Sequence, residues 1–248
     1  MQALINAIRF LTIVRIPERI APFASEPSAY AKSIPFFPVV GLLIGGIAAA
    51  AAWFTGLAAG PLVVAVVGCL MLAAVTGGLH LDGLADTADG FLSHAPREKL
   101  LEIMRDSRLG AMGGMAIAFV LLLKVALLAD LSSERQLVAL LMSPVAGRCM
   151  IVLMLTLLRY ARPGGGLGTA FCDFSKGIVL TWSMLFLVVL AVVLAGWGGA
   201  AGAVLGVLGV VGFAIICQKK IGGMTGDTLG AASEIAEILF ILGMVIVR

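Results

Sequence analysis

The sequence predicts an all-α, polytopic membrane protein, and two properties of the chain support this class. Residues of the AVILMFWYC set make up 61% of the 248 positions, charged residues make up only 12%, and the mean hydropathy is +1.11. These values exceed the apolar share of a soluble domain. Apolar runs of spanning length recur along the chain, and in lipid each must pair its backbone groups internally as a helix. We therefore expect about seven transmembrane helices in a single domain, residues 1–248.

The chain begins with a segment, residues 1–33, in which Arg9, Arg15 and Arg19 lie among apolar residues. It lacks a small-residue cleavage site, so it predicts an amphipathic helix on the membrane surface and not a secretory signal. The apolar runs that follow predict seven spans with approximate bounds: Pro35 to Phe54, Pro61 to Leu79, Gly110 to Leu131, Leu137 to Leu158, Ile178 to Gly196, Ala200 to Cys217 and Leu229 to Val247.

Basic residues predict the orientation of these spans. All but four of the 17 Lys and Arg residues fall in the N-terminal segment and the even-numbered loops. The exceptions are Arg135 and Arg248 on the opposite side and Lys124 and Arg148 inside spans, where we expect Lys124 to snorkel to the outer interface. Cytoplasmic loops retain Lys and Arg. The sequence therefore predicts a bacterial inner-membrane protein with a cytoplasmic N-terminus, and all but two of the 14 acidic residues share that cytoplasmic face.

The segment GGLHLDGLADTADGF, residues 77–91, directly follows the second predicted span. Asp82, Asp86 and Asp89 stand at i, i+4 and i+7, so on a helix they share one face. Like charges on one face repel each other, so a cation is expected among them. Carboxylates suit Mg²⁺ or Mn²⁺, and magnesium typically takes one or two carboxylates plus phosphate oxygens. We predict that these aspartates bind Mg²⁺, or Mn²⁺ in its place, and that His80 helps to bind the metal or the substrate or shuttles a proton; a solvated helix end is the simpler alternative.

A second acidic segment, GGMTGDTLGAASEIAEIL, covers residues 222–239. Asp227, Glu234 and Glu237 fall on one side of a helix, and both glutamates enter the seventh apolar run. Ionisable groups inside a span are costly enough that a functional role is the first hypothesis. We predict that Asp227 and Glu234 join Asp82, Asp86 and Asp89 as catalytic candidates, among which the sequence does not choose the general base. We also predict that Glu237 contacts substrate; an ion pair between a glutamate and Arg148 or a loop cation is the alternative.

Three arginines are candidates for phosphate binding. Arg105 and Arg108 lie one turn apart in PREKLLEIMRDSRLGAMGG, residues 96–114, an amphipathic part of the predicted cytoplasmic motif loop, residues 80–109. Their guanidinium groups are suited to charge-assisted hydrogen bonds with phosphate oxygens, although a positive-inside anchor would place them similarly. Arg148 lies inside the fourth span and needs an anionic partner or a water-filled cavity, and we predict a phosphate or carboxylate partner.

Other features narrow the class. The cysteines, Cys69, Cys149, Cys172 and Cys217, have no metal-type spacing and are expected to be small core residues. The formal net charge of +3 gives no reason to expect a nucleic-acid partner. The sequence has no Ser/His/Asp triad, P-loop or dinucleotide fingerprint, which leaves metal-assisted electrostatics as the predicted chemistry.

At these residues the chain resembles the cobalamin synthase family of adenosylcobinamide-GDP ribazoletransferases. The resemblance runs nearly full length and is carried by five segments: FLTIVRIP at 10–17, PFFPVVGLLIG at 35–45, GGLHLDGLADTADGF at 77–91, REKLLEIMRDSRLGAMG at 97–113 and GGMTGDTLGAASEIAE at 222–237. It implies Mg²⁺-dependent transfer of an adenosylcobinamide-phosphoryl group to α-ribazole, or α-ribazole 5′-phosphate, with release of GMP. The implied partners are these substrates and the lipid bilayer, and a homo-oligomer is compatible with the sequence.

Two other functions share some of these features. CDP-alcohol phosphotransferases also stack aspartates at a membrane edge, but their motif has Arg where this chain has Asp86, and a later Gly-x3-Asp-x3-Asp spacing is missing. An ion-coupled permease would also contain acids in helices. Transporters, however, place such groups near the midplane of two related halves, whereas here the acids are predicted at one edge and the sequence shows no internal repeat.

Overall fold

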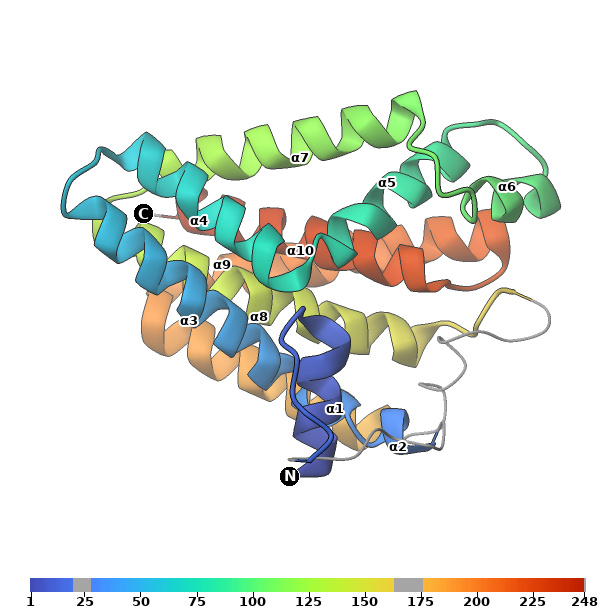
Figure 1. Cartoon of the computed structure of the whole chain (residues 1–248), viewed down its shortest axis with the longest axis horizontal. Helices are drawn as coiled ribbons and strands as arrows, with labels where there is room; N and C mark the ends of the chain where they lie inside the picture. The colour runs from blue at the N-terminus through green and yellow to red at the C-terminus, as the bar shows by residue number, and fades with distance from the viewer. Residues whose placement is uncertain (20–27, 163–175, 248) are drawn as a thin grey trace.

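The computed structural model describes residues 1–19, 28–162 and 176–247, and over these residues the chain is helical apart from loops and one isolated bridge between Tyr160 and Met224 (Figure 1). The elements follow in this order: α1 (Gln2–Leu11), α2 (Ser28–Ala31), η1 (Ile34–Phe36), α3 (Phe37–Gly56), α4 (Pro61–Thr76), α5 (Leu79–Phe91), α6 (Arg97–Ile103), α7 (Ala111–Ala129), α8 (Ser133–Leu157), α9 (Lys176–Ile221) and α10 (Gly226–Ile246). The predicted all-α class is confirmed.

Five helical stretches are long and apolar enough to cross a membrane: η1 with α3, α7, α8, α9 and α10. The bent pair α4 and α5 adds a sixth. α9 contains a break at Gly196, where φ is 58° and ψ is −141°. The chain reverses at this break into two antiparallel arms, which come so close that a Cβ on Gly199 would collide with the carbonyl oxygen of Ala191. Counting each arm as one pass gives the seven predicted spans.

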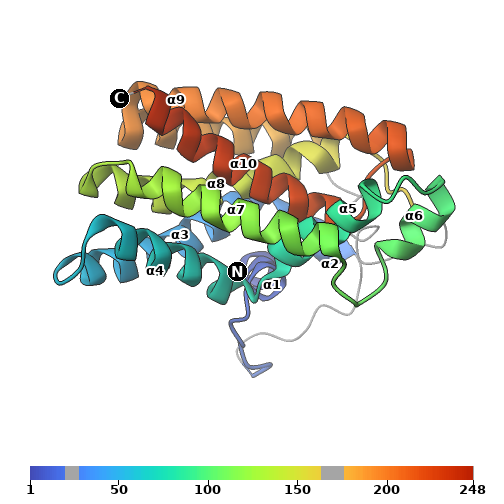
Figure 2. The ribbon, with the colours of Figure 1, turned by 90° about the horizontal axis from the view of Figure 1, so that it is seen from above.

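The centre of the bundle is α8, which packs against α3, α9 and α10 (Figure 2). In the most apolar 18-residue stretch of α8, 83% of the residues are buried, which is the highest share among the candidate spans. Gly41 and Gly45 of α3 face the α8 backbone; a Cβ on Gly41 would lie 2.6 Å from the carbonyl oxygen of Pro144. Small residues permit such close helix contact in membranes, where packing replaces the hydrophobic effect.

The helix α1 runs across the long helices of the bundle (Figure 1). Its Leu11 is buried, and the Phe10 ring lies 6.0 Å from the Phe37 ring of α3. Beyond α1, the backbone amide of Ile13 donates a hydrogen bond to the carbonyl oxygen of Val75 at the end of α4, at 2.9 Å. The helix predicted in the N-terminal segment is therefore present as α1. Its contact with lipid stays a prediction. Residues 20–27 of the segment lie outside the described part of the chain.

Three of the four cysteines, Cys69, Cys149 and Cys217, are buried free thiols, as predicted for core residues. Cys172 lies outside the described residues. The predicted motif loop, residues 80–109, contains two helices, α5 and α6, joined to α7 by a short loop. This region and the start of α10 lie at the same end of the bundle, opposite the C-terminus (Figure 1).

Candidate active site

A pair of glycines turns the chain between α4 and α5 and so sets the direction of the first acidic segment, residues 77–91. Gly77 and Gly78 both have positive φ, 63° and 73°, a conformation that glycine adopts without steric cost. They end α4 and turn the chain by 89° into α5. The Asp82 amide then donates to the carbonyl oxygen of Gly78 at 2.8 Å, so Asp82 lies in the first turn of α5.

Two further glycines bring α5 into backbone contact with α10. A Cβ on Gly83 would lie 2.7 Å from the carbonyl oxygen of Asp227, and a Cβ on Gly230 would lie 3.1 Å from that of His80. A side chain at Gly83 would require the backbone to move, and one at Gly230 would make an unusually tight contact. The close crossing places Asp82 beside Asp227, so the two acidic segments, which were predicted at one edge of the membrane, lie at one site.

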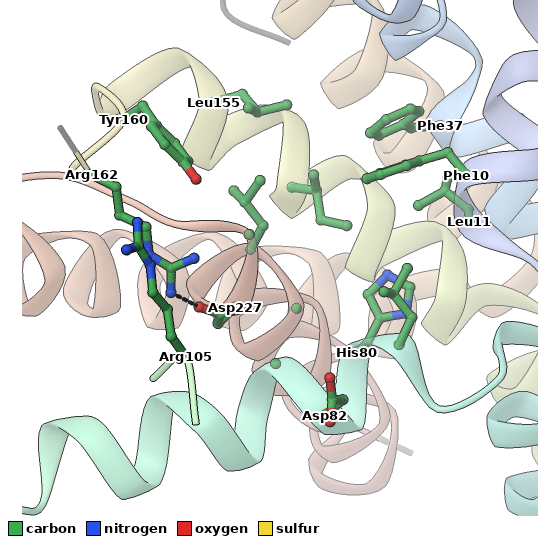
Figure 3. Close-up of a pocket in the computed structure, with 16 residues that line it drawn as sticks. Phe10, Leu11, Phe37, His80, Asp82, Arg105, Leu155, Tyr160, Arg162 and Asp227 are labelled. Atoms are coloured by element: carbon green, nitrogen blue, oxygen red, sulfur yellow. Dashed lines mark hydrogen bonds and ion pairs between the residues drawn. The ribbon is translucent and has the colours of Figure 1, made fainter. Parts of the chain in front are cut away.

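A cavity of about 360 Å³ opens between α1, α5, α8 and α10 (Figure 3). Its polar half is lined by Asp82, Arg105, Tyr160, Arg162 and Asp227. Its apolar half is lined by Phe10, Leu11, Phe37, Ile151 and Leu155. A volume of several hundred Å³ with few convergent polar groups is typical of a small-molecule site.

Within the polar half, Asp227 is positioned by a hydrogen-bond network. Thr225 caps α10, and its hydroxyl lies 3.2 Å from Asp227 Oδ2. Arg162 donates to the same carboxylate at 2.6 Å and also to the carbonyl oxygen of Met104 at 3.4 Å. Asp82, in contrast, is exposed, and among the residues that the structure describes its carboxylate has no hydrogen-bond or ion-pair partner. Its oxygens therefore remain available to a ligand.

The other two aspartates of the first segment have different surroundings. Asp86 is half-buried and lies close enough to Asp82 and Asp227 for their charges to act on it, but it does not line the cavity. Asp89 accepts hydrogen bonds from the backbone amides of Gly110 and Gly113, each at 2.8 Å. These amides form the N-terminus of α7, whose dipole favours an anion. Asp89 therefore joins α5 to α7, and its predicted role as a metal ligand stays a prediction.

The predicted site residues Glu234, Glu237 and Arg148 lie in a buried ion cluster, with exposed fractions of 5%, 2% and 2%. Lys124 donates to both glutamates at 2.7 Å, and Arg148 donates to the other oxygen of Glu237. The expectation that Lys124 snorkels outward was wrong, because two buried carboxylates outcompete the interface for its ammonium group. His80 lies 3.4 Å from Arg148 and also borders the cavity.

The cluster balances two cations against two anions, and this explains how four ionisable groups are tolerated inside the bundle. The alternative noted from the sequence, an ion pair between Glu237 and Arg148, is present. Direct contact of Glu234, Glu237 or Arg148 with substrate stays a prediction, since none of the three lines the cavity.

Of the two arginines in the segment between α6 and α7, Arg105 lines the cavity and Arg108 does not. Arg108 is exposed and hydrogen-bonds Asp106 through its side chain and its backbone amide, which lowers the pKa of Asp106 to about 2. This surface pair gives Arg108 a local partner, and its predicted phosphate contact stays a prediction.

Among residues 1–19, 28–162 and 176–247, no three His, Cys, Asp or Glu side chains are grouped as a metal cage requires. Magnesium does not need such a cage, because it keeps waters and takes phosphate oxygens beside one or two carboxylates. The donor set that faces the cavity is Asp82 and Asp227, and it fits that pattern better than the predicted set of Asp82, Asp86 and Asp89.

Sequence reasoning did not single out Arg162 or Tyr160, which follow α8 in a segment without a recognised motif. Arg162 was visible only as one of several loop cations, with no signal to separate it from a positive-inside residue. Tyr160 reaches the site through the bridge to Met224. The backbone hydrogen bonds that join these two segments, such as the one from the Ala161 amide to the Met224 carbonyl oxygen at 2.8 Å, cannot be seen in a sequence.

The fold and the cavity define a class: a multi-pass helical membrane protein with carboxylates and guanidinium groups gathered at one end of its bundle. Residues 3–245 match the family described as cobalamin-5-phosphate synthase. The chain belongs to that family.

Its curated relatives include proteins named adenosylcobinamide-GDP ribazoletransferase from several bacteria. The one from Klebsiella pneumoniae strain 342 is 41% identical over 96% of this chain and 97% of its own. The one from Clostridium novyi is 39% identical over 98% of this chain and 96% of its own length. The one from Roseiflexus is 40% identical over 94% of this chain and 85% of its own length. No solved structure matches the chain significantly.

Proposed function

We propose that this protein transfers the adenosylcobinamide-phosphoryl group of adenosylcobinamide-GDP to α-ribazole, or to α-ribazole 5′-phosphate. GMP is released, and adenosylcobalamin or its 5′-phosphate is formed. Family membership and near full-length likeness to proteins named for this reaction support the assignment. The observation that carries it is the meeting of Asp82 and Asp227 with Arg105 and Arg162 in one cavity.

The reaction forms a bond between an acceptor hydroxyl oxygen and the cobinamide-side phosphorus, and it breaks the bridge to GMP. Catalysis of such transfers is mainly positioning and neutralisation of phosphate charge. Arg105 and Arg162 are placed to donate charge-assisted hydrogen bonds to the diphosphate oxygens. Because Asp227 already orients the Arg162 guanidinium, the polar half is preorganised for an anionic substrate.

The acceptor hydroxyl must lose a proton to a base within hydrogen-bond reach. Asp82 is the best-placed group, since its carboxylate is exposed to the cavity while Asp227 is paired with Arg162 and Glu234 is buried with Lys124. Released GMP leaves with the bridging oxygen. In this account Asp82 takes up the proton and Asp227 positions the guanidinium.

Magnesium, or manganese in its place, is the proposed cofactor. Asp82 and Asp227 are the residues that would hold it, together with substrate phosphate oxygens and water. When bound, the ion would supply neutralisation of the charge on the diphosphate. We expect removal of divalent ions by EDTA to abolish turnover, and addition of Mg²⁺ to restore it.

The same end of the bundle carries the cavity and most of the basic loops, so the positive-inside rule supports a cytoplasmic active site in a bacterial inner membrane. A cysteine introduced at exposed Leu109 should then react with an impermeant thiol reagent only in inside-out vesicles. Labelling in intact cells would contradict this orientation.

The function is tested by assaying purified full-length protein in detergent for GMP release from adenosylcobinamide-GDP. We expect release that requires both α-ribazole and Mg²⁺. Protein that is folded but releases no GMP with either α-ribazole or its 5′-phosphate would overturn the assignment.

A further inference from the structure

The apolar half of the cavity has no part in the phosphoryl chemistry described above. Figure 3 shows Phe10 and Phe37 across the cavity from Arg162 and Asp227. These two aromatic residues come from α1 and α3, elements far from the acidic motifs in sequence. The cavity therefore joins a charged surface to an aromatic one, as a ligand with one charged and one apolar end would require.

The aromatic surface has a geometry suited to a flat ring. The ring centroids of Phe10 and Phe37 are 6.0 Å apart, and their planes differ by only 17°. Aromatic rings favour offset-stacked or edge contacts at centroid distances of roughly 4.5–7 Å. A third planar ring placed in the cavity can make such contacts with one of them and pack against Leu11, Ile151 and Leu155 at its edge.

The polarity of this half distinguishes the guanine of the donor from the nucleoside base of the acceptor, α-ribazole. The side chains that line this half are hydrocarbon apart from His80 at its edge, so a guanine there would have at most one side-chain partner for its amine and carbonyl groups. An unpaired buried polar group costs roughly 1–3 kcal/mol. The benzimidazole base of α-ribazole has a single free ring nitrogen as its acceptor, so it incurs less of that cost than guanine.

The sizes of the two hollows also favour different binding places for the donor and the acceptor. A second, open hollow shares Phe10, Leu79 and Asp82 with the cavity and extends past Gly77 and Gly78. The bulky corrinoid of the donor has room in such an open hollow, whereas the more enclosed cavity suits a nucleoside. Asp82 borders both, as expected for a residue that acts where two substrates meet.

From these contacts we infer that the apolar half of the cavity binds the base of the acceptor nucleoside, which is a flat and largely apolar two-ring aromatic system. The riboside then lies toward the polar half, with its hydroxyl near Asp82. Phe10 and Phe37 are thus specificity residues for the acceptor. This inference rests on the proposed function and adds the location of one substrate to it.

The test compares Phe10→Ala and Phe10→Leu with wild-type protein in the GMP-release assay. Loss of the ring should raise KM for α-ribazole about tenfold in Phe10→Ala and less in Phe10→Leu, which keeps apolar volume. KM for adenosylcobinamide-GDP should rise less than KM for α-ribazole, since Phe10 only borders the open hollow assigned to the donor, whereas the acceptor base packs against its ring. Phe119→Ala, which removes an exposed ring on α7, is the matched control and should change neither KM.

Equilibrium dialysis of radiolabelled α-ribazole against the same proteins, without donor, gives a second measurement that does not depend on turnover. Binding should weaken in Phe10→Ala and be retained in Phe119→Ala. An unchanged acceptor KM, an equal rise in both KM values, or a rise in the donor KM alone would overturn the inference. Wild-type protein without GMP release would instead overturn the proposed function, so the two failures are distinguishable.

Discussion

The first turn of α10 and its later turns both carry acidic residues, yet the surroundings of these residues are opposite. Asp227 lines the cavity and pairs with Arg162 at the rim of the bundle. Glu234 and Glu237 are buried and share Lys124 at 2.7 Å. The comparison teaches that acidity in a span does not by itself mark chemistry: the carboxylates with cavity access can act on substrate, and those neutralised inside the bundle hold helices together.

The largest expected effect falls on the buried cluster. Lys124→Met removes one cation and leaves two carboxylates buried with only Arg148, which should destabilise the protein by about 3–5 kcal/mol. The measurement is the thermal midpoint and the yield of monodisperse protein in detergent. Lys99→Met, which breaks an exposed pair with Glu102, is the control and should leave both unchanged. A Lys124 variant as stable as wild type would show that the buried cluster does not stabilise the fold.

The next effect falls on the cavity. Asp82→Asn should lower turnover on the order of 10²–10³-fold, because the amide cannot accept the proton or balance charge, while stability changes little. Turnover and thermal midpoint are measured on the same preparation. Glu98→Gln on α6 is an exposed control with wild-type values expected. Equal activity of Asp82→Asn and wild type would exclude Asp82 from the reaction.

A smaller effect should follow from separating the two helices that carry the site. Gly83→Ala places a Cβ against the Asp227 backbone and should cost about 1–3 kcal/mol of stability. Because it also moves Asp82 away from Asp227, turnover per folded molecule should fall. Gly46→Ala is the matched control, since a Cβ there meets no atom within 4 Å. Full activity of Gly83→Ala would show that the close crossing is not needed.

The smallest of these effects concerns Arg162. Arg162→Ala removes the partner of Asp227 and one donor to the diphosphate, and we expect KM for adenosylcobinamide-GDP to rise about tenfold, or ~1.4 kcal/mol. Arg159→Ala, an exposed neighbour in the same segment, should leave KM at the wild-type value. An unchanged KM in both variants would mean that the diphosphate binds elsewhere.

The sequence predicts much of this architecture because its signals are local. Runs of apolar residues predict the spans, and the spacing of Asp82, Asp86 and Asp89 predicts a shared helix face. Partners depend on three-dimensional packing, so hydropathy predicted an interfacial Lys124 where the fold provides two buried carboxylates. For the same reason the sequence did not separate Asp82, with access to the cavity, from Asp89, whose oxygens accept amides of α7.

The contrast along α10 is tested most directly by making Asp227→Asn and Glu237→Gln and measuring GMP release per folded molecule together with the thermal midpoint of each. We predict that Asp227→Asn loses most turnover at a near wild-type midpoint, and that Glu237→Gln lowers the midpoint but retains turnover in the molecules that fold. The reverse pattern, a stable but inactive Glu237→Gln beside an active Asp227→Asn, would contradict the account.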